Sequence, residues 1–77
     1  MQDFFEFFDS IAYDLSMRLE IGYSRITDWG IDVWKRGGGK NGQDLKILSI
    51  QDCDVKLAFA RAQVELKEWL CKHNGGY

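Results

Sequence analysis

The chain has 77 residues, a formal net charge of −2 and 45% hydrophobic residues. This length predicts one domain over residues 1–77, near the lower limit at which a hydrophobic core alone sustains folding. The apolar fraction excludes a disordered tail. The small net charge excludes a whole-molecule field that would attract nucleic acid or an anionic membrane.

Cysteine spacing and hydropathy predict a cytoplasmic protein. Cys53 and Cys71 would lie at opposite ends of a helix predicted over residues 52–73, roughly 27 Å apart at about 1.5 Å per residue. No disulfide spans that distance, and free thiols suit a reducing compartment. The apolar run 4–8 is interrupted by Glu6 and lacks a basic flank, so no signal peptide is expected. No segment is long enough to span a membrane.

Residues 3–15 are predicted to form an amphipathic helix. Its apolar stripe consists of Phe4, Phe8, Ile11, Ala12 and Leu15, which recur at helical spacing. The acids Asp3, Glu6, Asp9 and Asp14 give residues 1–16 a charge of −4. Phe7 points away from the centre of the stripe, on the side of Asp14. Because an exposed aromatic among acids is a candidate contact, we predict that Phe7, Asp9 and Asp14 bind a partner.

Two strands are predicted next. Residues 17–23 alternate apolar with polar or small residues, which indicates a half-buried strand; a continuation of the first helix is the alternative. Residues 29–36 are the second strand, with Trp29, Ile31 and Val33 on one face and Trp34 on the other. A two-layer domain buries only one sheet face. Trp34 therefore either contacts a partner or shields the open face, over Leu48 and Ile50.

Residues 37–43 contain four glycines and an Asn-Gly pair, which predicts a mobile hairpin loop. The loop does not fit a phosphate-binding loop, because it leads into a strand and no Ser or Thr follows Lys40. Together with Trp34, the basic residues Lys35, Arg36 and Lys40 make this hairpin a second candidate partner-binding surface, since tryptophan and arginine are frequent at binding hot spots.

The third strand is predicted over residues 44–50 and the final helix over residues 52–73, with Asp52 as its N-cap. Trp69 lies in the centre of this helix's apolar stripe. Short loops between consecutive strands favour an antiparallel meander with both helices on one face. The predicted fold class is therefore α+β, in the order helix, three strands, helix.

No residue pattern indicates catalysis, a cofactor or a metal. The single histidine, His73, falls in the last turn of the final helix, where the helix dipole favours it. Neither cysteine has a neighbouring base in the sequence, and there is no C-x-x-C, paired histidine or calcium-loop pattern. We therefore expect a protein that is not an enzyme.

The predicted order is similar to that of the double-stranded RNA-binding domain, and the spacing of Ala58, Ala60 and Ala62 resembles that family's second helix. That family holds phosphates with lysines at the start of this helix, where this chain has Asp52 and Asp54. The hairpin of Lys35, Arg36 and Lys40 would bind phosphates only weakly and in a salt-sensitive way. A nucleic-acid-binding module is therefore the alternative prediction.

A second resemblance covers about the last two thirds of the chain. Residues 28–37, 51–54, 65–70 and 74–77 resemble segments of small uncharacterised proteins from phages and integrated elements of anaerobic Gram-positive bacteria. The resemblance implies no catalytic motif, but it implies a context in which compact proteins bind host proteins, including components of antiviral defence. The sequence thus predicts a small protein-binding domain that inhibits a host protein by occluding its surface.

Overall fold

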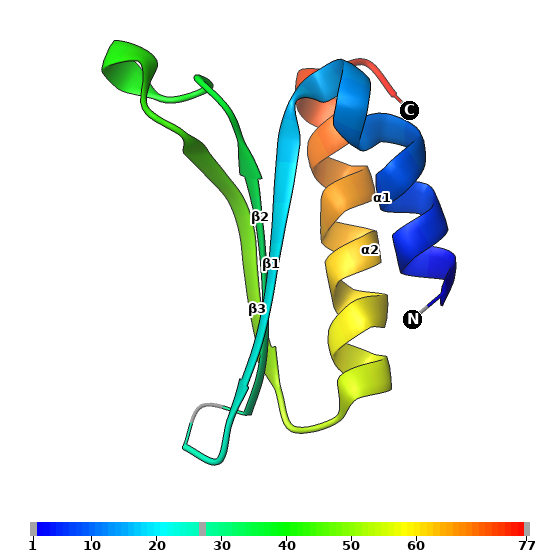
Figure 1. The fold of residues 1–77 in the computed structure, drawn as a ribbon. Helices are drawn as coiled ribbons and strands as arrows, with labels where there is room; N and C mark the ends of the chain where they lie inside the picture. The colour runs from blue at the N-terminus through cyan, green and yellow to red at the C-terminus, as the bar shows by residue number, and fades with distance from the viewer. Residues whose placement is uncertain (1, 27, 77) are drawn as a thin grey trace.

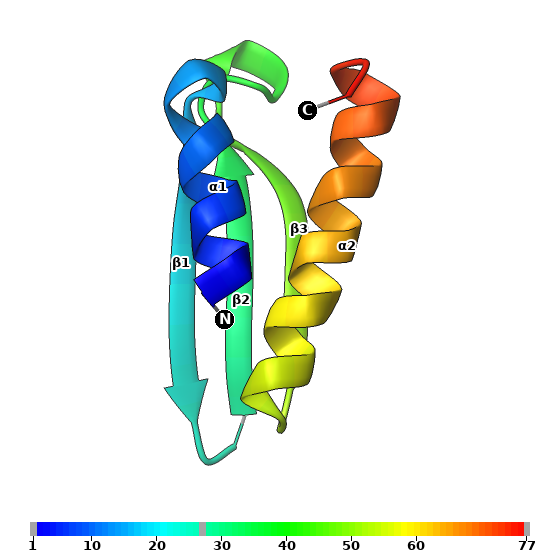
Figure 2. The ribbon, with the colours of Figure 1, turned by 90° about the vertical axis from the view of Figure 1, so that its right-hand side faces the viewer.

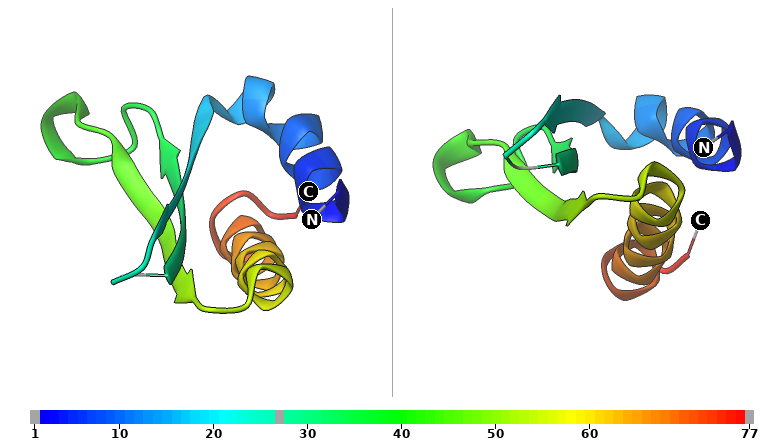
Figure 3. Two further views of the ribbon diagram at one scale, coloured as in Figure 1. Left: turned by 60° about the horizontal axis from the view of Figure 1, so that its bottom comes forward. Right: turned by 90° about the horizontal axis from the view of Figure 1, so that it is seen from below.

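The computed structural model describes residues 2–26 and 28–76. The elements run in the order α1 (Gln2–Leu15), β1 (Met17–Ser24), β2 (Asp28–Lys35), the short 3₁₀ turn η1 (Lys40–Gly42), β3 (Leu45–Asp52) and α2 (Val55–His73) (Figure 1). The strands form one antiparallel sheet in the order β1-β2-β3. Both helices lie on one side of this sheet (Figures 2 and 3). The predicted α+β class, element order and placement of the helices are confirmed.

The first helix ends at a backbone reversal. Ser16 adopts φ 54°, a left-handed conformation that stops helical propagation. Its backbone N–H donates to the Tyr13 carbonyl at 3.3 Å, and its own carbonyl accepts from the Arg36 N–H at 2.9 Å. The chain therefore enters the sheet at Met17, and the alternative of a continued helix is excluded.

The second helix begins at Asp54 and not at the predicted Asp52. The Asp54 carboxylate accepts hydrogen bonds from the backbone N–H groups of Lys56 at 2.9 Å and Leu57 at 3.2 Å, the arrangement of an N-cap. Asp52 is instead the last residue of β3, where its side chain accepts from the Asp54 N–H at 2.9 Å. The prediction failed because both acids suit the start of a helix and only the length of β3 decides between them.

The core lies between the sheet and α2, with one contribution from α1. Its fully buried side chains are Phe4, Ile31, Val33, Leu48, Ile50, Ala58, Phe59, Ala62, Leu66 and Leu70. The small Ala58 and Ala62 allow α2 to approach the strands closely. Phe4 is the single buried residue of α1, and its ring centroid lies 5.4 Å from that of Phe59. Helix α1 lies over β1, and α2 lies over β3 and β2.

Two aromatic side chains differ from their predicted environments. Trp69 was predicted at the centre of the core, but it is half-buried at the margin, with its ring centroid 4.8 Å from the His73 ring. Phe7 was predicted to be exposed among acids. It is half-buried and packs against the core from the side of α2, where the Lys67 ammonium lies 5.1 Å from its ring centroid. The burial of Phe7 arises because α1 packs beside α2, and no single-helix pattern specifies that contact.

Candidate functional site

The sheet face opposite the helices, here called the open face, is covered by neither α1 nor α2 (Figures 1 and 3). The register of the strands assigns it Arg18, Glu20, Gly22 and Ser24 from β1, Asp28, Gly30, Asp32 and Trp34 from β2, and Lys46, Ser49 and Gln51 from β3. These residues form cross-strand rows, because directly paired residues project to the same side of a sheet. The open face is therefore mostly polar, with one large aromatic side chain.

Trp34 lies between two cations in one of these rows. The Arg18 guanidinium carbon is 5.1 Å and the Lys46 ammonium 4.8 Å from the centroid of the Trp34 ring, within the range of cation–π attraction. These two side chains leave the indole half-buried. Its Nε1 is fully buried, and no described residue accepts a hydrogen bond from it. The row thus combines an aromatic surface, two positive charges and an unused donor.

A β-bulge positions Lys46 in this row. The pairing of β2 with β3 shifts between Val33 and Trp34, so that Leu48 pairs with Val33 while Lys46 pairs with Trp34. Ile47 is the extra residue, and it packs against the core. A bulge adds one residue to one strand and redirects its side chains. In a regular strand the consecutive apolar residues Ile47 and Leu48 would face opposite sides of the sheet. Because of the bulge, both face the helices.

The predicted placement of Trp34 opposite Trp29, Ile31 and Val33 is confirmed by the register. The predicted shielding of Leu48 and Ile50 by Trp34 is wrong, because both side chains are buried in the core on the helix side of the sheet. The contacts of Trp34 on the open face are instead with cationic side chains. No pattern in the sequence predicted a role for Arg18 or Lys46.

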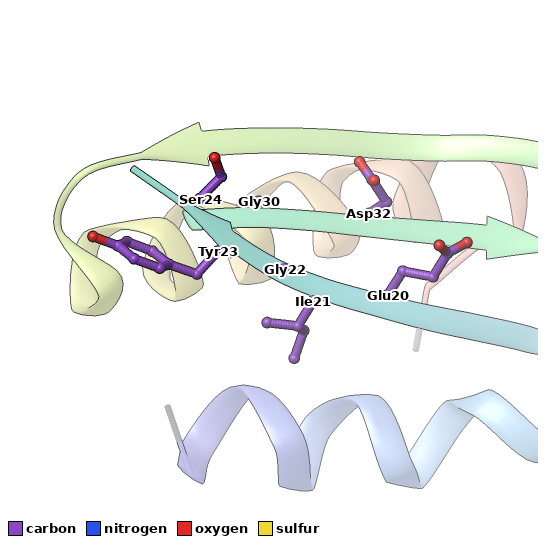
Figure 4. Close-up of a pocket in the computed structure, with 7 residues that line it drawn as sticks. All are labelled: Glu20, Ile21, Gly22, Tyr23, Ser24, Gly30 and Asp32. Carbon is purple, nitrogen blue, oxygen red and sulfur yellow. The ribbon is translucent and has the colours of Figure 1, made fainter. Parts of the chain in front are cut away.

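A shallow depression of about 340 Å³ lies over β1 and β2 near the end of the β1–β2 hairpin (Figure 4). Its lining consists of Glu20, Ile21, Gly22, Tyr23, Ser24, Gly30 and Asp32. In Figure 4, Ile21 points toward α1, whereas Glu20 and Asp32 project on the other side of β1. The floor is bare because Gly22 pairs directly with Gly30 and neither contributes a side chain.

Neither backbone conformation nor packing requires glycine at these two positions. Neither residue has a positive φ, unlike Gly37 in the hairpin loop, where φ is 63°. A Cβ atom added at Gly22 would meet nothing within 4 Å, and one added at Gly30 would meet only the Gly22 carbonyl oxygen at 3.9 Å. Glycine weakens a strand interior, and one common reason for its presence is the close approach of another molecule.

Two carboxylates stand beside this depression. Glu20 and Asp32 are direct cross-strand partners, a placement that is destabilising for like charges. The Arg18 guanidinium pairs with Glu20 at 3.3 Å and with Asp44 at 3.6 Å. Asp32 has no hydrogen bond or ion pair with the residues that the structure describes. The open face is thus polarised, with cations around Trp34 and an uncompensated acid near the glycines.

The predicted basic hairpin divides into separate parts. Lys35 lies on the helix side of the sheet, where its ammonium donates to the Leu15 carbonyl at 3.4 Å and supplies the cation that the last turn of α1 lacks. Arg36 and Lys40 have exposed side chains, and the loop that carries them bends away from the helices (Figures 1 and 3). The structure therefore does not group Lys35 with Trp34.

The predicted acidic surface lies in the helix layer. Asp9 and Asp14 are exposed on α1, and Tyr13 beside them is 93% exposed. Phe7 does not join them at the surface, because it turns toward α2. This surface and the open face lie on opposite layers of the molecule, so a single small partner contacts one or the other (Figure 1).

Another group of interacting polar residues lies at the start of α2. The backbone N–H of Asp54, which donates to the Asp52 carboxylate, lowers the pKa of Asp52, and the Arg61 guanidinium at 3.3 Å lowers it further.

Cys53 and Cys71 are free and exposed. Within residues 2–26 and 28–76, no three potential metal ligands cluster, and no helix is long and apolar enough to cross a membrane.

No protein-family model, curated protein or solved structure matches the chain.

Proposed function

We propose that this chain is a non-enzymatic protein-binding domain that contacts its partner through the open face. The facing pair of Gly22 and Gly30 is the observation that carries the proposal. Strand glycines cost stability, by roughly 0.5–1 kcal/mol each relative to alanine. Since neither φ nor steric space requires them here, their value lies in a bare surface that another backbone can approach closely.

Trp34 supplies the second support. Tryptophan and arginine are the residue types most enriched at interface hot spots, and Trp34 stands beside Arg18 on the open face, near the end of β2. The indole N–H is covered and has no acceptor among the described residues, so a partner would supply one only once the neighbouring side chains move aside. Leaving such a donor unpaired costs about 1–3 kcal/mol. A hydrogen bond from the indole N–H to the partner would remove this cost and so favour binding.

The biological role that we propose is inhibition of a host protein by surface occlusion. It rests on the resemblance of residues 28–37, 51–54, 65–70 and 74–77 to proteins of phages and integrated elements. A domain of this size that carries no reactive centre can block a larger protein only by covering a functional surface. An open sheet face suits that task because its side chains are held in register by the fold.

Nucleic-acid binding is the alternative, and one observation favours it. The row of Arg18, Trp34 and Lys46 adds two cations to the exposed Arg36 and Lys40 at the same end of the sheet. The acids on the open face, including Asp32, oppose a phosphate backbone. We therefore expect only weak binding of DNA or RNA at physiological salt.

The test compares proteins captured from a host lysate by the immobilised chain and by a Gly22→Ala/Gly30→Ala variant. Each added methyl group fits the fold, so the free energy of unfolding should stay the same or rise by about 0.4–1 kcal/mol per site. The same methyl groups cover the bare backbone at the floor of the depression, and capture should be lost. This variant separates binding from stability, because the expected loss of binding accompanies an equal or higher melting temperature.

The matched control is Asp9→Asn/Asp14→Asn on α1, which should retain capture. If this control loses capture and the glycine variant keeps it, the acidic helix is the interface and the open-face proposal is wrong. The nucleic-acid alternative is measured with labelled duplex DNA and RNA. A micromolar or tighter complex that disappears when Arg36, Lys40 and Lys46 are neutralised would replace the protein-binding proposal.

A further inference from the structure

The outward side of α2 carries a second apolar stripe, distinct from the one that faces the core. Leu57, Val64 and Cys71 recur every seven residues, and Ala60 lies between the first two. Leu57 is 49% and Val64 56% exposed, and Ala60 and Cys71 are also exposed. We call these four residues the outer stripe. Residues seven apart align on one side of a helix, here the side turned away from the sheet.

Two shallow hollows flank Val64 along the outer stripe. One, of about 360 Å³, is lined by Leu57, Ala60, Arg61, Val64 and Glu65, and the other, of about 490 Å³, is lined by Val64, Lys67, Glu68, Cys71 and Lys72. Val64 belongs to both and forms a ridge between them. A two-fold axis at Val64 sets the hollow beside Leu57 of one copy opposite the hollow beside Cys71 of a second copy.

We propose that two copies of this chain pair through their outer stripes, with the α2 helices antiparallel about a two-fold axis at Val64. Such an axis places each residue opposite the one equally far from Val64 in the other direction. Leu57 and Cys71 are each seven residues from Val64, so Leu57 of one copy enters the hollow beside Cys71 of the other. The interface is isologous, as in most homodimers.

The charges beside the outer stripe complement one another in this arrangement. Arg61 precedes Val64 by three residues and Glu68 follows it by four, so at about 1.5 Å per residue they lie roughly 4.5 Å and 6 Å from the axis. Helical spacing also places both on the same flank of α2. The two-fold rotation therefore brings Arg61 of one copy to the level of Glu68 of the other, and it does so twice. A parallel pair would instead set Arg61 and Glu68 of the two copies at different levels and on opposite flanks, so they would not meet.

Both charged groups are able to make this contact. Arg61 donates through Nη1 to the Asp52 carboxylate at 3.3 Å and to the Gln51 carbonyl at 3.4 Å. A guanidinium has five N–H donors, so other donors remain. Glu68 has no ion pair or hydrogen bond in the part of the chain that the structure describes. The pairing leaves both open faces uncovered, so it is independent of the proposed function.

Disulfide trapping tests the geometry. In a Cys53→Ser background, the substitution Leu57→Cys should yield a reducible covalent dimer through Cys71 of the second copy. Positions 57 and 71 of one helix are about 21 Å apart, too far for a bond within one chain. The matched control adds Cys71→Ser and should remain monomeric. Cross-linking of that control through position 57 would indicate parallel helices and overturn the proposal, as would the absence of cross-linking in both.

Sedimentation analysis of the unmodified chain supplies the second measurement. The average mass should rise from one chain toward two as concentration increases. Val64→Glu should hold it at one chain, and Tyr13→Glu, on the exposed side of α1, should behave like the parent. Glu68→Arg should weaken pairing, and Arg61→Glu/Glu68→Arg should restore it, with folding of each variant checked by melting. A parent that stays at one chain, or a double variant that fails to recover, contradicts the proposal.

Discussion

At the scale of the residue, the ring of Trp34 contributes to the fold, whereas its N–H group matters only for the proposed binding. The fold uses its ring, which two cations cover, but makes no use of its indole N–H. A phenylalanine would satisfy the fold nearly as well. Under the proposed function, an acceptor on the partner would use this N–H group, and a substitution that removes it can test this.

We expect Trp34→Phe to change the free energy of unfolding by less than about 1.5 kcal/mol, because an aromatic ring is kept and no hydrogen bond is lost. Partner capture should weaken by up to about tenfold, the value of one hydrogen bond. The control is Trp29→Phe, a half-buried tryptophan on the helix side, which should leave capture unchanged. Urea titration and capture assays report the two quantities, and equal capture by both variants would show that the N–H has no role in binding.

Gly22 and Gly30 show what a sequence can and cannot reveal about a site at this scale. They lie at equal distances from the β1–β2 turn, so an antiparallel pairing of the two predicted strands would have placed them opposite one another. The missing information was that no side chain from elsewhere fills the space above them. That depends on which face the helices cover, and a local pattern does not contain it.

At the scale of the element, α1 depends on one anchor. Phe4 is its only fully buried residue, whereas Phe8, Ile11 and Leu15 are half-buried. Its C-terminus is held by Lys35, which comes from β2. The helix is therefore specified more by distant contacts than by its own sequence.

Phe4→Ala should cost about 3–5 kcal/mol, because it removes a whole ring from the core. Trp69→Ala should cost less than Phe4→Ala, although tryptophan is the larger residue, because Trp69 lies at the margin of the core. Thermal melts of both variants rank the two sites. The opposite ranking would place Trp69, and not Phe4, at the centre of packing.

The start of α2 should depend on pH through Asp52. The pKa of its carboxyl is lowered from 3.8, first by the Asp54 N–H and then by Arg61. A lowered pKa in the folded state stabilises the protein at pH values above 3.8, and this contribution is lost as pH falls through the folded-state pKa. The stability difference between the parent and Asp52→Asn should therefore be largest near neutral pH and shrink in acid. Urea unfolding at several pH values measures it, and a constant difference would contradict the assignment.

The order and type of both helices and all three strands followed from hydrophobic periodicity, because each is long enough to show its period, whereas the short turn η1 was predicted only as part of a loop. Three details required tertiary information. The bulge at Ile47 depends on the pairing of β3 with β2, the N-cap at Asp54 depends on where β3 ends, and the burial of Phe7 depends on α2. For the site, periodicity placed Trp34 on the correct face but did not identify its cross-strand neighbours Arg18 and Lys46.

At the scale of the whole molecule, α2 separates the two cysteines. Cys53 lies two residues before the helix and Cys71 two residues before its end, so the helix keeps their thiols apart. We expect two reactive thiols per chain when denatured, non-reduced protein is titrated. Along α2, Val55 and Cys71 are about 24 Å apart at about 1.5 Å per residue, and Cys53 precedes Val55 by two residues, so no internal disulfide can form. A monomeric preparation with no reactive thiol would contradict the continuous helix.

The two sides of β2 have a consequence for how this protein can diversify. Ile31 and Val33 are fixed by the core, while Asp32 and Trp34 face away from it. Because successive residues of a strand project to opposite faces of the sheet, the open-face side chains can change without altering the side chains that fill the core. A combinatorial library at positions 20, 24, 32, 34, 46 and 49 should therefore retain a high proportion of folded members while altering specificity. The same fold could therefore be redirected to new binding partners. Within β2 alone, the core residues would stay fixed while the alternating open-face residues change.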